Sequence, residues 1–575
     1  MLNRLGLRPL LIALPLVLAS ACAPRTAEAP PATASAAAVP GMVSAADPRA
    51  AEAGRDILRQ GGSAADAALA MMLALTVVEP QSSGIGGGSF LVYNDSASGK
   101  VSTYDGREEA PAAASPSYFL GPDGKPREHD EAIPGGLSVG VPGNIRQLEL
   151  AHERHGKLPR AALFAPAIRL ARDGFAITAR MRRALDSSRE TGALSASGRA
   201  LFYEANGEPK PVGTIVRNPE LAAFLETLAE RGPDAFYTGP AAAALVRTVR
   251  SSTRNPSIMT EGDLATYDAR ERPAACGSYR GWRICGMGPP SSGATTVYAI
   301  LKQLERFDLK GMGPDSVTAW HLIGESSRLA YADREAYLGD PDYVRVPMAG
   351  LFDPAYLASR SALISPDRSI PHVTHGFPPG APRVTAALDT EVSGTSHMVA
   401  VDRFGNVASL TSTIESAFGS GLMVNGFYLN NELTDFTFAP EKDGAPVANR
   451  VEGGKRPRSS MSPTIVYGPD GKVRIAIGAA GGPTIIAQVA KSLIAVLDWN
   501  MSAQDAIALP VIMGVGDRVL LEKGTKLEAM MPALIALGDR ASTFPPGFKA
   551  NAVEWVGGHW AGAADPRSEG VAVGE

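Results

Sequence analysis

The sequence predicts a mixed α/β protein in which helices come first and strands dominate the C-terminal third. Between about residues 143 and 252, apolar residues recur at helical spacing, and each run ends in a polar residue or Gly. After Pro382, short apolar runs between tight turns indicate strands, with one long apolar helix at 484–499 among them. At 575 residues without an internal repeat, the chain can bury a large core, either in several domains or in one extended architecture.

Two helices and a strand are predicted near the start of the chain. Ala and Leu recur at helical spacing over residues 47–78, where Gly61 and Gly62 separate two helices and Glu79 with Pro80 ends the second. A glycine-rich turn at 84–88 and then a strand follow. A phosphate-binding loop would carry Gly-Lys-Ser/Thr and open a helix, so we interpret this turn as a place of close backbone packing.

Composition narrows the classes of function. With 45% hydrophobic and 20% charged residues, the chain has the composition of a globular protein. Its net charge is -4, and it contains no long basic run. Because nucleic-acid binding needs a basic surface, we exclude nucleic acid as a partner.

The first residues predict that the chain is exported. Arg4 and Arg8 precede an apolar stretch at 9–19, and small residues follow it up to Cys22. This is the pattern of a secretory signal, and the stretch is shorter than a transmembrane span of about 20 residues. We therefore expect residues 1–21 to be a signal peptide that directs the protein to the periplasm.

Cys22 leaves two alternatives for the removal of that signal. Small residues directly before a cysteine resemble a bacterial lipoprotein signal, in which Cys22 becomes a lipid anchor, although Ala19 stands where Leu is usual. Ordinary cleavage after Ala21 is the other alternative. Residues 22–40 are rich in Ala and Pro and cannot pack a core, so we expect them to form a tether.

Cys276 and Cys285 flank a short segment that is typical of a hairpin around Tyr279, Arg280 and Gly281. Across paired strands the two sulfurs can meet, and an oxidising compartment permits a disulfide. Two buried free thiols are an equally open alternative at this point.

A second predicted hairpin brings two threonines together. If residues 396–402 and 407–414 pair as antiparallel strands, Thr395 lies opposite Thr413 or Ile414. Directly opposed residues share a face of the sheet, with Cβ atoms about 4.5–5.5 Å apart. Such a pair also occurs as ordinary decoration of a sheet, so it does not by itself indicate catalysis.

Three further stretches carry groups that suit an amino-acid amide. One places adjacent hydroxyls beside Arg and Lys, a combination that binds a carboxylate. Another places two glycines between a strand and a long helix, where backbone N–H groups can stabilise an oxyanion. The last offers two carboxylates for an ammonium. In that order the residues are Ser459 and Ser460, Gly481 and Gly482 ahead of Pro483, and Glu432 and Asp435. Each stretch also has a purely local explanation, as a capped turn, a strand end or a solvated loop.

Together these stretches resemble, in order and spacing, the small-subunit motifs of the γ-glutamyltransferases, also called γ-glutamyl transpeptidases or glutathione hydrolases. The motifs are "TSHMVAVDRFGNVASLTSTIESAFGSG", "LNNELTDF", "KRPRSSMSPTIV" and "GAAGGPTII". Upstream, "GGSAADAALA", "EPQSSGIGGGSF", "DGREEAP", "PPSSGATT" and "ADREAYLGDPDYV" are similar to large-subunit motifs. The resemblance runs from about Gly41 to Arg567. It implies an N-terminal nucleophile hydrolase fold, an αββα sandwich of four layers with a helix-rich large subunit.

The resemblance also implies a zymogen that cleaves itself between Gly394 and Thr395. The large subunit would span residues 41–394 and the small subunit 395–575, with Thr395 as the nucleophile. Its freed α-amine, with a pKa of about 7.7–8.0, would act as the base. Thr413 would hold the hydroxyl, and Gly481 and Gly482 would form the oxyanion site.

The same resemblance implies a clamp for the γ-glutamyl group. Arg107 would pair with the α-carboxylate, aided by Ser459 and Ser460, since a guanidinium fork fits a carboxylate. Glu432 and Asp435 would accept the α-ammonium. The donors would be glutathione or other γ-glutamyl small molecules, and the acceptors water, amino acids or peptides, without a metal or organic cofactor.

One residue and one segment depart from the family's pattern. Glu415 stands two residues after Thr413, where well-studied members have Asn, and it adds a charge beside the amino pocket. The segment between Phe436 and Lys455 is short and lacks the tyrosine found in the lid of some bacterial members, which favours hydrolysis over transfer.

Two other functions are compatible with parts of the sequence. A related acylase that cleaves glutaryl or other side-chain amides would share the fold, but it should lack the ammonium-binding acids Glu432 and Asp435. A non-catalytic, lipid-anchored binding protein would never mature, whereas this chain keeps Thr395, Thr413 and both glycines.

Overall fold

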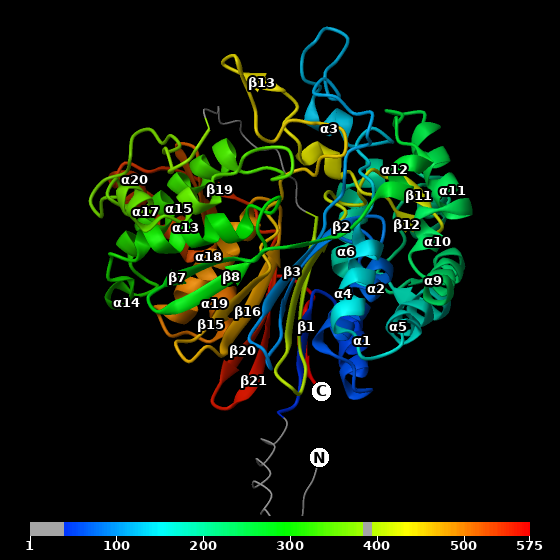
Figure 1. Cartoon of the computed structure of the whole chain (residues 1–575), viewed down its shortest axis with the longest axis horizontal. Coiled ribbons are helices and arrows are strands. Elements are labelled where there is room, and N and C mark those ends of the chain that lie inside the picture. Colours follow the sequence, from blue (N-terminus) through cyan, green and yellow to red (C-terminus); the bar gives the residue numbers. More distant parts are fainter. Residues whose placement is uncertain (1–38, 383–393) are drawn as a thin grey trace, which may run out of the picture. The chain divides into compact units, whose positions relative to one another are not determined.

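The computed structural model describes residues 39–382 and 394–575 (Figure 1). The predicted signal peptide, Cys22 and nearly all of the tether lie outside the described residues. Within residues 39–575, two β-sheets face each other, and helices cover the outer face of each sheet (Figure 1). This arrangement confirms the predicted four layers.

The first sheet has seven strands, and every neighbouring pair in it is antiparallel. In spatial order its strands are β22 (Val571–Gly574), β1 (Met42–Ala45), β9 (Ser396–Val401), β10 (Val407–Thr413), β2 (Gly88–Asn94), β3 (Val101–Gly106) and β6 (Arg270–Arg272). The central strands β9, β10 and β2 are buried on both faces. Helices cover one face of these strands and the second sheet covers the other, so none of their residues is exposed to solvent.

The second sheet has six strands and is also antiparallel. Its strands, in spatial order, are β21 (His559–Ala564), β20 (Lys549–Val556), β16 (Val473–Ala480), β15 (Thr464–Tyr467), β8 (Trp282–Gly286) and β7 (Ala275–Tyr279). Side chains alternate between the layers. In β9, Met398 and Ala400 belong to the core beneath the helices of the first sheet, whereas Val399 and Val401 belong to the core shared with the second sheet.

Helices complete the outer layers. Against the first sheet lie α1 (Pro48–Arg59), α2 (Ala64–Val78) and α4 (Asn144–His155), and against the second lie α13 (Gly293–Leu304), α18 (Thr484–Leu497) and α19 (Ala503–Ala508). Every residue of α2 is buried, since α1 and α5 (Arg160–Asp173) cover the side that faces away from the sheet. Because α2 is covered on all sides, it carries apolar residues on every face of the helix. Ser63 and Asp66 form a capping box at its start.

The remaining elements surround this frame. The helices are α3 (His129–Ala132), α6 (Ala179–Ser187), α7 (Arg189–Gly192), α8 (Ala196–Phe202), α9 (Pro219–Arg231), α10 (Asp234–Tyr237), α11 (Gly239–Arg250), α12 (Glu261–Thr266), α14 (Leu309–Met312), α15 (Val317–Tyr337), α16 (Met348–Leu351), α17 (Pro354–Ser361), α20 (Lys526–Ala536) and the 3-10 turn Glu432–Asp435. The short strands are β4 (Phe175–Ala176), β5 (Ile215–Val216), β11 (Met423–Val424), β12 (Phe427–Tyr428), β13 (Glu441–Lys442), β14 (Ala445–Pro446), β17 (Ile512–Val515), β18 (Arg518–Glu522) and β19 (Arg540–Phe544). Among all described residues, no helix has both the length and the apolar character needed to cross a membrane.

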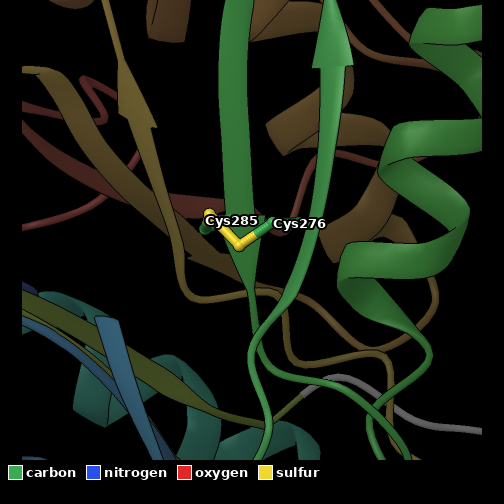
Figure 2. The surroundings of a disulfide bond; sticks show 2 residues. All are labelled: Cys276 and Cys285. Carbon is green, nitrogen blue, oxygen red and sulfur yellow. A yellow bond between two sulfur atoms is a disulfide. The ribbon is translucent and has the colours of Figure 1, made fainter. Parts of the chain in front are cut away.

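A disulfide joins Cys276 to Cys285 across β7 and β8 (Figure 2). The two residues are direct partners in the antiparallel register, with Cα atoms 4.1 Å apart. The hairpin expected from the sequence is present, and of the two alternatives for these cysteines the structure contains the bonded one.

Candidate active site

Thr395 and Thr413 lie side by side at the open end of the β9–β10 hairpin. Ser396 pairs with Ser412 and His397 pairs with Thr411, so the same register places Thr395 across from Thr413. Their Oγ1 atoms are 3.2 Å apart, and both residues are buried. The predicted register is therefore confirmed.

The carbonyl group of Gly394 lies against both hydroxyls. Thr395 Oγ1 donates a hydrogen bond to this carbonyl oxygen, and Thr413 Oγ1 lies 3.3 Å from it. The backbone N–H of Glu415 donates to Thr413 Oγ1 at 2.8 Å. Because Thr413 is held by this amide, it can orient the hydroxyl of Thr395 toward the preceding peptide carbonyl.

The glycine-rich turn at 84–88 packs against the end of β10. A Cβ atom on Gly87 would lie 1.9 Å from the carbonyl oxygen of Thr413, and one on Gly86 would lie 2.2 Å from that of Tyr428. No side chain fits at either position, so the interpretation of this turn as close backbone packing is confirmed. It sets the position of the strand end that carries Thr413.

Gly481 and Gly482 connect β16 to α18 in front of Thr395. Their φ angles are 130° and 56°, a region that favours glycine over residues with a Cβ. Gly482 lines the same pocket as Thr395 and Thr413, while Gly481 stands directly before it at the strand end. The N-terminus of a helix in this place can stabilise an oxyanion.

One small pocket collects nearly all of the predicted site residues. Its volume is about 20 Å³, which is close to the space that one water molecule requires. Met461 and Ile485 add apolar wall that the sequence did not predict. The predicted residues that line it are Arg107, Gly394, Thr395, Thr413, Glu415, Glu432, Asp435, Ser459, Ser460 and Gly482.

Arg107, which directly follows β3, is buried at the base of this pocket. Its guanidinium pairs with Glu432 and Asp435 and donates to the carbonyl oxygens of Pro457 at 3.1 Å and Arg458 at 2.9 Å. Burial alone would lower the pKa of Arg107, but the charges of Glu432 and Asp435 outweigh it and raise the pKa. In the empty site, the three charged residues assigned to the substrate therefore bind one another.

Two glutamates near Arg107 hold their protons more strongly than usual. Burial raises the pKa of Glu432 well above its ordinary value; Arg107 opposes this shift, and the negative charges of Glu108 and Glu415 add to it. Glu108 was not predicted as a site residue, although it lies within the "DGREEAP" motif. It is fully buried, and burial raises its pKa to about 8.

Glu415 lines the pocket with Glu432 and Asp435, as predicted. Its carboxylate accepts hydrogen bonds from Ser416 Oγ and, at 2.6 Å, from Asn431 Nδ2. Its φ angle is 74°, in the left-handed region that Asn adopts several-fold more readily than most residues with side chains. The backbone at this position therefore suits Asn better than Glu.

Ser459 and Ser460 reach the pocket, but the basic residues beside them do not line it. Ser460 Oγ accepts a hydrogen bond from Arg334 at 2.8 Å, and Ser459 Oγ accepts one from the N–H of Met461. Lys455 donates to the carbonyl of Ala448, while Arg456 pairs with Asp105 and Glu109. Lys455 and Arg456 therefore bind other groups in the empty site, and the expectation that cations of this stretch help to bind a carboxylate stays a prediction.

The sequence is similar to known proteins over most of its length. The profile of the family described as Gamma-glutamyltranspeptidase matches residues 50–575. A glutathione hydrolase proenzyme of Bacillus subtilis (strain 168) is 36% identical over 547 residues, covering 93% of this chain and 91% of that protein. An acylase ACY 1 proenzyme of Pseudomonas sp. (strain SE83) is 33% identical over 515 residues and covers 88% of each.

Solved structures share the fold. A cephalosporin acylase from Bacillus halodurans has a TM-score of 0.81 at 24% identity and covers 96% of this chain and 98% of that chain, which shows likeness of fold alone. A gamma-glutamyltranspeptidase from Helicobacter pylori has a TM-score of 0.55 at 34% identity, covering 59% of this chain and 95% of that chain. The predicted N-terminal nucleophile hydrolase fold is therefore confirmed.

Proposed function

Because this chain belongs to the gamma-glutamyltranspeptidase family, we propose that it is a self-processing glutathione hydrolase and γ-glutamyltransferase with Thr395 as its nucleophile. The observation that supports this most directly is the pocket in which Thr395 and Thr413 meet Arg107, Glu432 and Asp435. A hydroxyl pair beside a buried cation and carboxylates suits the amide of a zwitterionic amino acid. The enzyme acts as a hydrolase when water takes the acyl group and as an acyltransferase when an amine does.

Maturation uses the contact between Thr395 and Gly394. Thr395 Oγ attacks the Gly394 carbonyl carbon, the C–N bond to Thr395 breaks, and the nitrogen takes the hydroxyl proton. Water then hydrolyses the resulting ester, which leaves a carboxylate on Gly394 and a free α-amine on Thr395. The products are a large subunit ending at Gly394 and a small subunit of residues 395–575.

The free amine then serves catalysis. With a pKa of about 7.7–8.0, it is partly neutral near pH 7.5 and can accept the proton of Thr395 Oγ. The hydroxyl oxygen attacks the γ-carbonyl carbon of the donor, the amide C–N bond breaks, and the proton passes to the leaving amine. Gly481 and Gly482 lie where they can stabilise the negative oxygen. Attack by water or an acceptor amine on the γ-glutamyl ester restores the threonine.

Donor binding must open the ion pairs of the empty pocket. Arg107 contacts Glu432 and Asp435 in the empty pocket, so a donor that binds to all three residues must separate these pairs. A zwitterion brings one negative and one positive charge, so its carboxylate can replace the acids at Arg107 while its ammonium takes those acids. A donor without the ammonium leaves buried carboxylates without a counter-charge, which is strongly unfavourable. This argument favours γ-glutamyl amides over the glutaryl amides of the acylase alternative.

Two further features refine the proposal. The short 437–454 segment forms the β13–β14 hairpin and contributes no lining residue to the pocket, which supports hydrolysis over transfer. Export to the periplasm and the lipid anchor at Cys22 rest on the sequence pattern of residues 1–40. The intact mass of the mature protein reports signal removal and lipid addition together.

N-terminal sequencing tests the nucleophile. We expect two associated chains, with the smaller one beginning at Thr395, and a single uncleaved chain for Thr395→Ala. The purified parent should release the anilide from a γ-glutamyl anilide. A small chain that begins at another residue would exclude Thr395, and failure to cleave the anilide would exclude γ-glutamyl chemistry.

A further inference from the structure

A buried lysine contacts the residue that follows the proposed nucleophile. Lys549 is the first residue of β20, and its buried side chain reaches from the second sheet to the first. Its Nζ lies 3.0 Å from Glu79 Oε2, 3.1 Å from Ser82 Oγ and 3.2 Å from Ser396 Oγ. The reaction described above does not use this lysine.

The contacts of Lys549 fit a charged ammonium, because its three N–H donors meet three oxygen acceptors. Ser396 Oγ also donates to Glu79 Oε2 at 2.7 Å, so this carboxylate accepts from both neighbours. Burial lowers the pKa of Lys549 to about 8, although Glu79 opposes the shift. Arg180 adds to the lowering, and Asp47 opposes it. At pH 7 and below, Lys549 therefore carries its charge.

Lys549 lies between two strand ends of the reaction centre. In the register of the second sheet, it is the partner of Ala480, the residue before Gly481. Its side chain contacts Ser396, the residue after Thr395. The ammonium therefore adjoins both the strand that leads to the oxyanion glycines and the strand end that carries the proposed nucleophile.

The charge of this lysine acts on the proposed base, the α-amine that self-cleavage frees on Thr395. The amine is one residue away from Ser396, and one residue of extended chain spans about 3.3–3.6 Å. Buried charges at such separations interact more strongly than charges in water, because little solvent screens them. A positive charge disfavours the protonated amine and lowers its pKa, whereas a negative charge raises it.

We propose that Lys549 is a positioning residue whose charge keeps the freed α-amine of Thr395 unprotonated, so that this amine acts as the base near neutral pH. The proposal rests on the proposed function, in which the amine takes the proton of Thr395 Oγ. Ser396 holds the lysine close to the amine, and Glu79 balances the lysine charge. Lys549 itself transfers no proton and acts through its charge alone.

Other charged groups face the amine and the lysine. In the donor pocket they are Arg107, Glu415, Glu432, Asp435 and the carboxylate that cleavage creates on Gly394, and beside the lysine they are Arg180 and Asp47. His397, also at the start of β9, stays neutral because burial lowers its pKa to about 3. None of these groups changes in the variants below, so a difference from the parent reports Lys549 and Glu79.

The pH dependence of kcat/KM for a γ-glutamyl anilide tests the proposal, because its acid limb reports the pKa of the base in the free enzyme. Lys549→Met removes a positive charge and leaves Glu79, so the limb should move upward by about one pH unit. Well below the limb, kcat/KM should then fall about tenfold, while the plateau above it should change less. A limb that stays in place in the folded variant would overturn the proposal. If Lys549→Met does not fold, Lys549→Gln keeps a donor for Glu79 and should show the same shift.

A charge-balanced variant distinguishes charge from packing. The double variant Glu79→Gln, Lys549→Met removes both charges, so its limb should return toward the position of the parent. A purely structural role predicts the reverse, since the double variant loses more contacts than the single one. Lys491→Met is the matched control: Lys491 is also buried, but it donates to backbone carbonyls at the end of α19 and does not line the donor pocket. Its loss should leave the limb in place.

Labelling of the amine separates this proposal from the proposed function. Acetic anhydride reacts with an unprotonated amine, so the pH dependence of acetylation at the N-terminus of the small chain, followed by mass spectrometry, reports the pKa of the Thr395 amine without turnover. Lys549→Met should raise this pKa by about one unit. If the parent matures at Thr395 but cleaves no γ-glutamyl donor, the proposed function fails, and labelling alone decides. An unchanged labelling pKa would overturn the proposal, and a small chain that begins elsewhere would overturn it together with the nucleophile.

Discussion

Thr395 Oγ1 lies 3.2 Å from Thr413 Oγ1, at the point where β9 and β10 open toward the pocket. Thr413 is held in turn by the N–H of Glu415, and both hydroxyls lie against the Gly394 carbonyl. The register of a single hairpin thus brings together the proposed nucleophile, the hydroxyl proposed to orient it and the bond proposed to be cleaved first.

Removing the second hydroxyl should slow maturation and turnover together. In Thr413→Ala, Thr395 loses a partner that typically contributes about 0.5–1.5 kcal/mol, so both rates should fall up to roughly tenfold. Thr413→Ser keeps the hydroxyl and should retain most of both rates. Time courses of self-cleavage on a denaturing gel and of anilide release measure the two effects. Normal maturation of Thr413→Ala would show that Thr413 does not orient the first attack.

Arg107→Gln should impair donor use while leaving self-cleavage intact. The variant loses a charge-assisted pair, which typically costs about 1.5–3 kcal/mol, so kcat/KM for a γ-glutamyl anilide should fall at least tenfold. Arg107→Lys keeps the charge without the planar fork and should fall less. Because removing this cation leaves Glu432 and Asp435 without their buried partner, thermal unfolding must be measured alongside. An unchanged kcat/KM in a folded variant would remove Arg107 from the donor site.

His397 should make the protein less stable in mild acid. It is buried between the sheets, with Nδ1 2.8 Å from Thr411 Oγ1, and burial lowers its pKa to about 3. The unfolded chain, with a pKa near 6.5, binds a proton between pH 3 and pH 6.5 that the folded chain does not bind. Stability is therefore complete above pH 6.5 and falls by about 1.4 kcal/mol per pH unit below it.

Thermal unfolding at pH 7.5 and pH 5 checks this effect. His397→Gln should reduce the loss of Tm between the two pH values, whereas His559→Gln, at an exposed position, should not. Equal losses in parent and His397→Gln would mean that other groups cause the acid sensitivity.

Local patterns were sufficient to predict the catalytic hairpin but not the sheet around it. The two-residue period and the turn at 403–406 limited the partner of Thr395 to Thr413 or Ile414, because both signals depend on neighbouring residues, and the structure contains the first of these registers. By contrast, β1 pairs Met42–Ala45 with Val571–Gly574 from the other end of the chain. No local period specifies such a partner, so β1 was missed, whereas β2 and the β7–β8 hairpin, which depend on local signals, were predicted.

The state of the empty pocket was not predictable from motifs. From the motifs, Arg107 was expected to bind the carboxylate of the substrate, and Glu432 and Asp435 its ammonium. In the structure Arg107 pairs with both acids instead. Buried charges need partners at every stage of the cycle, and without a donor these three satisfy each other. Glu108 was missed because Arg107 alone accounts for the function expected of the "DGREEAP" motif. The feature that marks Glu108 as part of the site is its burial, which the sequence does not show.

Glu415 should determine how strongly the enzyme discriminates γ-glutamyl from glutaryl amides. Glu415 lines the pocket with Glu432 and Asp435, and its negative charge adds to the rise of the pKa of Glu432. A donor ammonium would compensate these acids, and a glutaryl group would not. Glu415→Asn should therefore lower the ratio of kcat/KM for the two amides roughly tenfold, equivalent to about 1.4 kcal/mol of differential binding. Self-cleavage should continue, because Thr413 contacts the backbone N–H of residue 415 rather than its side chain.

Glu415→Gln separates charge from conformation: both variants remove the charge, but only Asn relieves the φ angle of 74°. Equal ratios in the two variants would assign the effect to charge, with Asn giving the higher Tm. If both variants keep the parent's ratio of kcat/KM for the two amides, the Glu415 carboxylate does not affect donor choice. Its role is then limited to its hydrogen bonds with Ser416 and Asn431.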